Sequence, residues 1–227
     1  MFNEVPPRYD LINYIITLGM DSRWRRRAAE KCLEEKPGKV LDIGCGTGDL
    51  AIKIALMHES EGEITGLDYS QPMLELARVK ADKREVAERV SFVHGEATAI
   101  PFSSGYFDCV GIAFAFRNLT YMNPLKVPHL AEVLRVLKHN GRYVIVETSQ
   151  PANRIVKILF HLYLRAFVGP LGSLLSGNRG AYKYLAESAS RFYAPGEIRE
   201  MLLSAGFREV RYHPLFLGAA GIHVAIK

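Results

Sequence analysis

The chain has 227 residues, of which 48% are hydrophobic and 23% charged, and its formal net charge is +5. These values are typical of an ordinary globular protein. A chain of this length buries a sizeable core and needs no disulfide or metal to hold it together. Its three cysteines, Cys32, Cys45 and Cys109, form no CxxC pair, which excludes a zinc-ribbon or disulfide framework. We therefore expect no metal site and a cytoplasmic, reducing location.

The mildly basic charge permits a nucleic-acid or anionic-membrane partner but does not require one. The densest basic run is Arg23, Arg25, Arg26 and Arg27, interleaved with Trp24. Such a run is usually the solvated face of a helix. Contact with phosphate or a membrane is the alternative, and no nucleic-acid partner is expected.

Targeting and membrane signals are weak. The N-terminal sequence MFNEVPPRYD does not have the pattern of a secretory signal. The longest apolar stretch, residues 155–175, is interrupted by Lys157, His161, Arg165 and Pro170, which argues against a membrane span.

In chain order, residues 7–36 are predicted to be helical with a break near Gly19, and Pro37-Gly38 ends them. Short apolar strands then alternate with helical periodicity. The predicted strands are 39–43, 63–67, 90–94, 109–113 and 142–147. The helices between them are 48–57, 72–84 and 124–137, and the last is expected to end in a glycine cap at 138–141.

Residues 151–193 interrupt this alternation as a mostly helical insertion, and a helix at 195–205 and strands near 209–213 and 221–226 follow. Continuous apolar strands alternating with helices predict a parallel sheet covered on both faces. We expect one α/β domain over residues 1–227, with N-terminal helices in residues 1–36.

A glycine-rich loop, LDIGCGTGD at residues 41–49, joins the first predicted strand to the next helix. Gly44, Gly46 and Gly48 let the backbone turn sharply and approach a ligand closely. A dinucleotide fingerprint needs a glycine where Asp49 stands. S-adenosylmethionine (SAM) has a cationic sulfonium and ammonium, so carboxylates such as Asp42 and Asp49 favour it. A tight turn without a ligand is the third interpretation.

Two further strand ends point to the same crevice. Asp68 follows the second strand, at the distance from the loop at which an acidic residue binds ribose hydroxyls. It could instead cap the next helix, although Ser70 is better placed for that. After the third strand, Glu96 and Ala97 are placed to meet an adenine edge.

Several segments carry a resemblance that runs from Phe2 to Lys227. They are YDLIN (9–13), SRW (22–24), LDIGCGTGD (41–49), IPFSSGYFD (100–108), FRN (116–118), RVLK (135–138), YKYLAES (182–188) and AGF (205–207). Together they resemble the ubiquinone/menaquinone biosynthesis C-methyltransferases. The loop, the PF…FD stretch and AGF are shared by many SAM methyltransferases, whereas FRN and YKYLAES are more diagnostic of this family.

The resemblance implies a doubly wound, seven-stranded, mostly parallel sheet with an antiparallel last strand. It implies methyl transfer from SAM to a ring carbon of a prenylated quinol, either demethylmenaquinol or a benzoquinol precursor of ubiquinone. The expected SAM-binding residues are Asp42, Gly44, Gly46, Thr47, Gly48, Asp68, Tyr69, Met73, Glu96, Ala97 and Ala113. The sequence departs from the family pattern at Cys45, Glu96, Ala113, residues 147–151 and residues 223–227.

The chemistry suggests roles for four more residues. Methyl transfer from a sulfonium is an in-line displacement, and a reduced quinol supplies the electron density that a carbon acceptor needs. We expect Arg117 to hold a water or a developing phenolate and Asn118 to orient the acceptor. Tyr9 would cap the site. His223 is either a base or a structural histidine.

The segment 151–177 is predicted to be an acceptor-side lid. Lys157, His161 and Arg165 recur every four residues along an otherwise apolar helix. A wide apolar face with a basic stripe suits a helix at a membrane surface or one shielding a prenyl tail. Packing on the sheet or on a second subunit is the alternative, so a homodimer stays open. Two other functions also stay open: methylation of a different acceptor, and a non-catalytic binding domain.

Overall fold

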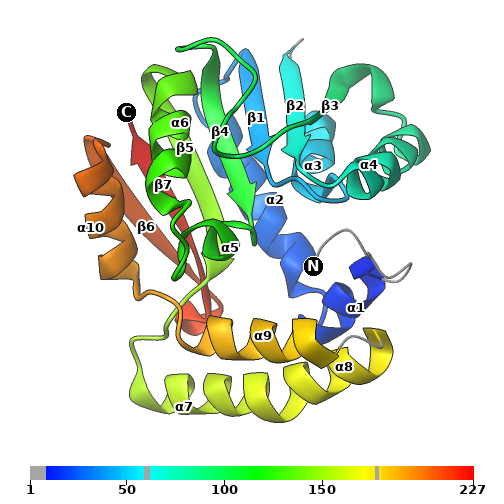
Figure 1. Ribbon diagram of the computed structural model, residues 1–227, viewed down its shortest axis with the longest axis vertical. Helices are drawn as coiled ribbons and strands as arrows, with labels where there is room; N and C mark the ends of the chain where they lie inside the picture. The colour runs from blue at the N-terminus through cyan, green and yellow to red at the C-terminus, as the bar shows by residue number, and fades with distance from the viewer. Residues whose placement is uncertain (1–8, 59–61, 177–178) are drawn as a thin grey trace.

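The computed structural model describes residues 9–58, 62–176 and 179–227. One sheet has the strand order β3-β2-β1-β4-β5-β7-β6 (Figure 1). Its strands are β1 (Lys39–Ile43), β2 (Glu63–Asp68), β3 (Val90–His94), β4 (Phe107–Ala113), β5 (Leu137–Thr148), β6 (Glu209–Leu215) and β7 (Ala220–Ile226). β1 to β5 pair in parallel, and β7 is antiparallel to both neighbours. The predicted mixed sheet is confirmed.

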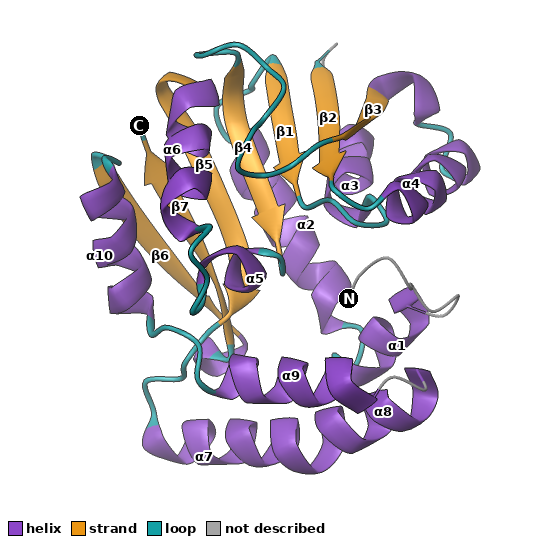
Figure 2. Cartoon of the chain, viewed as in Figure 1, coloured by secondary structure: helices purple, strands orange, loops and turns teal. Residues whose placement is uncertain are grey.

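Helices cover both faces of this sheet (Figure 2). They are α1 (Tyr9–Ile16), α2 (Met20–Leu33), α3 (Asp49–Met57), α4 (Gln71–Lys83), α5 (Phe116–Thr120), α6 (Lys126–Val136), α7 (Arg154–Tyr163), α8 (Gly169–Ser176), α9 (Arg179–Ser190) and α10 (Pro195–Ala205). α2, α3 and α4 pack on one face, and α6 and α10 on the other. Because both faces are buried, the central strands are mostly apolar, and Asp42 of β1 is a buried exception.

A third layer of helices crosses the carboxyl ends of the parallel strands. α7 continues through a π-helical segment, Leu164–Val168, into α8, and α9 lies between α7 and the sheet (Figure 1). Ile12 and Ile16 of α1 pack here against Leu164, Val168 and two alanines of α9. The N-terminal helices and the insertion therefore meet over the edge of the sheet where open α/β folds bind ligands.

The predicted glycine cap at 138–141 is wrong. α6 ends at Val136, and Leu137 already has an extended backbone that starts β5. The left-handed residue is Asn140, with φ 60°, inside an irregularity between the pairs Phe107–Leu137 and Cys109–Arg142. The turn signal thus marks a bulge within a strand rather than the end of a helix.

One buried polar pair connects α6 to the ligand-binding edge. His129 is fully buried, and its Nδ1 donates to the carbonyl oxygen of Ala97 at 3.2 Å. The ring is neutral because burial lowers the pKa of His129 to about 4, so its Nε2 accepts from the hydroxyl of Tyr143 at 3.0 Å. The loop that carries Ala97 is therefore held by a neutral imidazole.

We predict that this histidine makes the protein acid-sensitive. An unfolded histidine titrates near 6.5, so between about pH 6.5 and 4 the unfolded chain binds the extra proton. Stability is retained in full above pH 6.5 and falls by about 3 kcal/mol as the pH drops toward 4. Chemical denaturation across this range should show a shallower loss for His129→Gln. The exposed His139→Gln is the matched control, and an equal slope in both variants would contradict the assignment.

Candidate active site

The glycine loop leaves β1 and leads into α3. Gly44, Gly46 and Gly48 all have left-handed backbones, with φ values of 62°, 55° and 79°. A Cβ on Gly44 would lie 2.9 Å from the Cβ of Ala115, so only glycine fits where the loop passes the end of β4. Gly48 packs instead against Phe92 of β3 and does not line the pocket. Its predicted role is thus limited to shaping the turn.

Asp68 ties the end of β2 to this loop. Its Oδ2 accepts from the backbone N–H of Gly46 at 2.8 Å, and its Oδ1 accepts from that of Ser70 at 2.8 Å. Ser70 precedes α4, but its side chain makes no capping hydrogen bond. The carboxylate is therefore fixed by backbone donors on both sides, beside the glycine loop.

Asp42 is buried beneath the loop. Its Oδ2 accepts from the backbone N–H of Ala51 at 3.1 Å, while its Oδ1 has no hydrogen-bond partner among the described residues. Burial raises the pKa of Asp42 to about 8. An unpartnered buried carboxyl oxygen beside a pocket favours a cationic ligand, which would stabilise its charged form.

These groups line one pocket of about 630 Å³. It brings together most of the expected residues: Asp42, Gly44, Gly46, Thr47, Asp68, Tyr69, Met73, Glu96, Ala97, Ala113, Arg117 and Asn118. Tyr9 begins α1, but its side chain lies outside the described residues. The strand ends β1, β2, β3 and β4 thus contribute to a single cavity.

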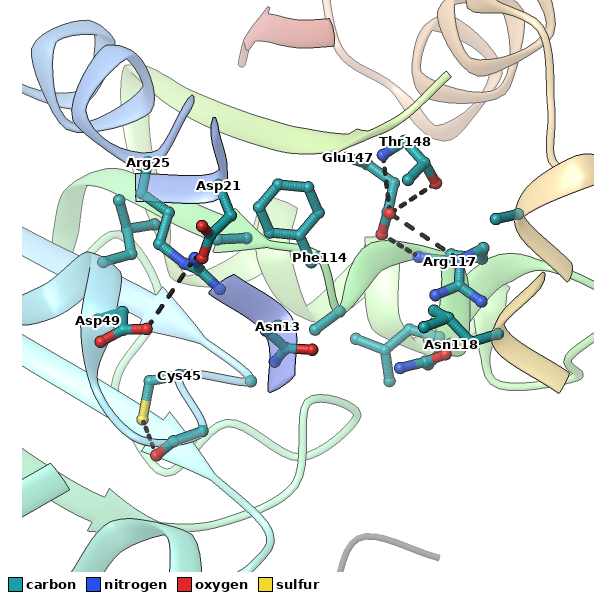
Figure 3. A pocket seen from close by; sticks show the side chains of 18 of the residues that line it. Asn13, Asp21, Arg25, Cys45, Asp49, Phe114, Arg117, Asn118, Glu147 and Thr148 are labelled. Atoms are coloured by element: carbon teal, nitrogen blue, oxygen red, sulfur yellow. Dashed lines mark hydrogen bonds and ion pairs between the residues drawn. The ribbon is translucent and has the colours of Figure 1, made fainter. Parts of the chain in front are cut away.

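The other end of the pocket contains a buried ion pair that sequence reasoning recognised only in part. Arg117 is 3% exposed and Glu147, at the end of β5, is 2% exposed. The Nε of Arg117 lies 3.9 Å from Oε1 of Glu147, and its backbone N–H donates to Oε2 at 3.1 Å (Figure 3). Its guanidinium also donates to the hydroxyl of Ser188 on α9. No local spacing signals Glu147, because the pair forms only when α5 folds back on β5.

His223 does not belong to this site. It lies in β7, is 2% exposed and packs its ring 4.7 Å from that of Tyr212. Burial lowers its pKa to about 4, and it is not among the residues that line the pocket. The structural interpretation of this histidine is the one that the geometry supports.

The basic run on α2 divides in two. Arg26 and Arg27 pair with Glu30 and have side chains about 70% exposed, at 70% and 71%. Arg25 turns inward, where it pairs with Asp21 and lines the pocket. The solvated-face interpretation thus holds for Arg26 and Arg27 but not for Arg25.

Comparison with known proteins identifies the family of this chain. The family model described as the ubiE/COQ5 methyltransferase family matches residues 1–227. The chain belongs to this family. It is 43% identical to a demethylmenaquinone methyltransferase of Thermus thermophilus, over 99% of this chain and 98% of that protein. It is 37% identical to a ubiquinone/menaquinone biosynthesis C-methyltransferase UbiE of Citrifermentans bemidjiense, over 100% of this chain and 94% of that protein.

A solved SAM-dependent methyltransferase of Aquifex aeolicus has the same fold, with a TM-score of 0.61 at 22% identity over 87% of this chain and 88% of that one. The protein is a SAM-dependent methyltransferase. The pocket fits SAM, because Asp21, Asp42 and Asp49 line it and suit a ligand with a sulfonium and an ammonium. When bound, SAM supplies the methyl group.

We expect Asp68→Ala to weaken SAM binding. If the carboxylate holds the ribose hydroxyls, losing a charged hydrogen-bond acceptor should lower the affinity about ten- to hundredfold in calorimetry. The same factor should apply to 5′-methylthioadenosine, which keeps the ribose but lacks the amino-acid part. The control is Glu75→Ala, at an exposed position on α4. Unchanged affinity in the Asp68 variant would refute the ribose contact.

Proposed function

We propose that this protein transfers a methyl group from SAM to a ring carbon of a prenylated quinol in respiratory quinone biosynthesis. The acceptor is demethylmenaquinol or a benzoquinol precursor of ubiquinone. The names of relatives at 37% and 43% identity support a quinone ring as the acceptor. The observation that carries the proposal is one continuous pocket that joins the glycine loop to a wall of Phe160, Tyr163, Leu164 and Val168. That apolar wall suits an aromatic ring with a prenyl tail.

In this proposal the nucleoside end of SAM lies over β2 and β3. Asp68 binds the ribose hydroxyls, and Glu96 and Ala97 meet the adenine edge. The glycine loop and Thr47 approach the remainder of the donor, and the methyl group faces β4. Tyr69, Met73 and Ala113 complete the walls around it.

Arg117 acts on the acceptor. A carbon nucleophile gains electron density when its neighbouring hydroxyl loses a proton, so an enzyme stabilises the developing phenolate. The Nε of Arg117 has no hydrogen-bond partner among the described residues, although it lies near Glu147. This guanidinium stays protonated and holds the phenolate oxygen, directly or through a water. Asn118 orients the ring, and Tyr9 caps the site.

Glu147 positions Arg117. Besides the contacts with Arg117, its Oε1 accepts from the backbone N–H and the hydroxyl of Thr148, at 2.9 and 3.0 Å. A carboxylate held by these donors keeps the arginine at one place on the wall. Removing either charge leaves the other buried and unpaired, which is strongly destabilising.

We predict that turnover requires a reduced acceptor and Arg117. With radiolabelled SAM, methyl transfer to a demethylmenaquinol analogue should need a reductant, because an oxidised quinone ring is electron-poor. Arg117→Ala should lower kcat about 10²- to 10³-fold, while calorimetry shows nearly unchanged SAM affinity.

Arg117→Lys is the matched variant, because it keeps the charge beside Glu147 and separates chemistry from folding. It should bind SAM normally and remain slow, since a lysine does not reproduce the fork of donors. Equal rates with quinone and quinol in the absence of reductant would contradict the mechanism. A panel of other hydrophobic acceptors tests the alternative substrate class.

We also propose that the enzyme is cytoplasmic and docks on the membrane through the outer face of α7. Ile155, Ile158, Leu159 and Leu162 on this face are between 59% and 69% exposed. Arg154, Lys157 and Arg165 are exposed beside them, and residues 151–176 include no acidic residue. An apolar stripe flanked by basic residues suits an anionic membrane surface.

The opposite face of the same helix is turned inward. Phe160 and Leu164 line the pocket, as the prenyl-shielding interpretation of this helix requires. By length and composition alone, the continuous helix Arg154–Leu175 could cross a membrane, despite the four residues that interrupt its apolar stretch. Crossing would remove one wall of the pocket, so a position along the membrane surface preserves the site.

We predict that substitutions on the two faces of α7 have different effects. Ile158→Ser with Leu162→Ser should weaken sedimentation with phosphatidylglycerol vesicles and spare activity on a tail-less quinol. Phe160→Ser with Leu164→Ser should retain vesicle binding and lose activity on long-chain quinols. Binding should weaken with salt, because each basic residue contributes about 1 kcal/mol near an anionic surface.

Circular dichroism checks that both double variants remain folded. If the Ile158/Leu162 variant binds vesicles as well as the unchanged protein does, the membrane proposal is wrong. If that variant instead abolishes a dimer seen by ultracentrifugation, the face belongs to a second copy of the chain.

A further inference from the structure

Arg25 lines the pocket. The residues proposed above to contact the ribose, the adenine and the acceptor do not include it. It lies on α2, which crosses the sheet over β4 and β5. Its side chain is 12% exposed, whereas that of Arg26, the next residue on the helix, is 70% exposed. Burying a guanidinium is costly unless it is paired, so Arg25 requires specific partners in the pocket that Arg26, which stays in water, does not need.

Those partners hold the guanidinium still. Its Nη1 lies 2.5 Å from Oδ2 of Asp21 and 4.0 Å from Oδ2 of Asp49, and its central carbon lies 5.1 Å from the ring centroid of Phe114 (Figure 3). The hydroxyl of Thr17 donates to the other oxygen of Asp21 at 2.9 Å. The arginine is thus fixed between the first turn of α3 and the end of β4.

Phe114 itself has an unusual backbone. Its φ of 60° is left-handed, a conformation that costs a bulky residue about 1 kcal/mol or more. Such strain is found most often at ligand sites. Here it accompanies a ring that lies beneath Arg25 and lines the same pocket.

The charges at this end of the pocket match the amino-acid end of SAM. That end carries two cations, the sulfonium and the α-ammonium, and one anion, the α-carboxylate. The pocket is lined by three acidic side chains, Asp21, Asp42 and Asp49, together with Arg25, and Asp49 also pairs with Lys80 at 2.6 Å. Among the described residues that line the pocket, the cationic side chains are Arg25 and Arg117. Arg117 is paired with Glu147 on the acceptor side.

The order of the strands gives the same placement. Asp68 at the end of β2 and Ala97 after β3 lie on one side of β1, and Phe114 after β4 lies on the other. A donor whose nucleoside lies over β2 and β3 extends its amino-acid end past the glycine loop toward Asp49 and α2.

We propose that Arg25 binds the α-carboxylate of the methionine part of SAM. A guanidinium can donate to Asp21 and still present a pair of N–H groups to a second carboxylate. The proposal rests on SAM as the donor and is independent of the acceptor.

The experiment compares SAM with decarboxylated SAM, which keeps the sulfonium and the amine but lacks the α-carboxylate. Calorimetry on the unchanged protein should show about ten- to hundredfold tighter binding of SAM. Arg25→Gln should lose that factor for SAM and leave the affinity for decarboxylated SAM within about twofold. Arg26→Gln, on the exposed side of the same helix, should bind both ligands as the unchanged protein does.

Asp68→Ala serves as an internal standard, because a ribose contact should weaken both ligands equally. If Arg25→Gln also weakens both equally, Arg25 has a structural role alone and the proposal fails. If Arg25→Gln does not fold, the unchanged protein still decides the question. Equal affinity of the unchanged protein for SAM and decarboxylated SAM would overturn the proposal.

Discussion

Parallel strands β1 to β5 end at one edge of the sheet, and this geometric constraint brings the residues at their ends together. Residues that follow different strands, such as Asp68 and Glu147, share one pocket although they are far apart in the sequence. The third layer of helices then closes the same edge. Without α1, α7 and α9 the strand ends would face water, where charge interactions are weak.

Along this edge, the charged side chains differ between the two ends of the pocket. Acidic side chains gather around the glycine loop, where we propose that the cationic methyl donor binds, and burial raises the pKa of Asp42 to about 8. In the proposed mechanism, Arg117 at the other end meets the negative charge that develops on the acceptor. The two ends are joined by the short stretch from Ala113 to Arg117, over which the methyl group would pass in the proposed mechanism.

The sequence predicts the parts of this site that are local. The turn after β1 needs left-handed backbones at Gly44, Gly46 and Gly48, so a GxGxG pattern identifies it. The contacts of Arg117 with Glu147 and Ser188 form instead only when separate elements fold together, and so does the inward orientation of Arg25. No spacing in the sequence encodes them. Likewise α7 has apolar residues over most of its surface beside a narrow basic stripe, so periodicity could not tell that Phe160 faces the pocket while Ile158 faces outward.

The left-handed Phe114 and two of the buried polar groups that lack a hydrogen-bond partner lie in the pocket. Among the described residues, buried side-chain polar atoms without a hydrogen-bond partner belong to Asp42, Arg117 and His223, and the first two line the pocket. Each such group costs about 1–3 kcal/mol when its partner is missing. In the proposed complex, groups on the donor and the acceptor would offset these costs at Asp42 and Arg117, so that ligand binding would also stabilise the fold.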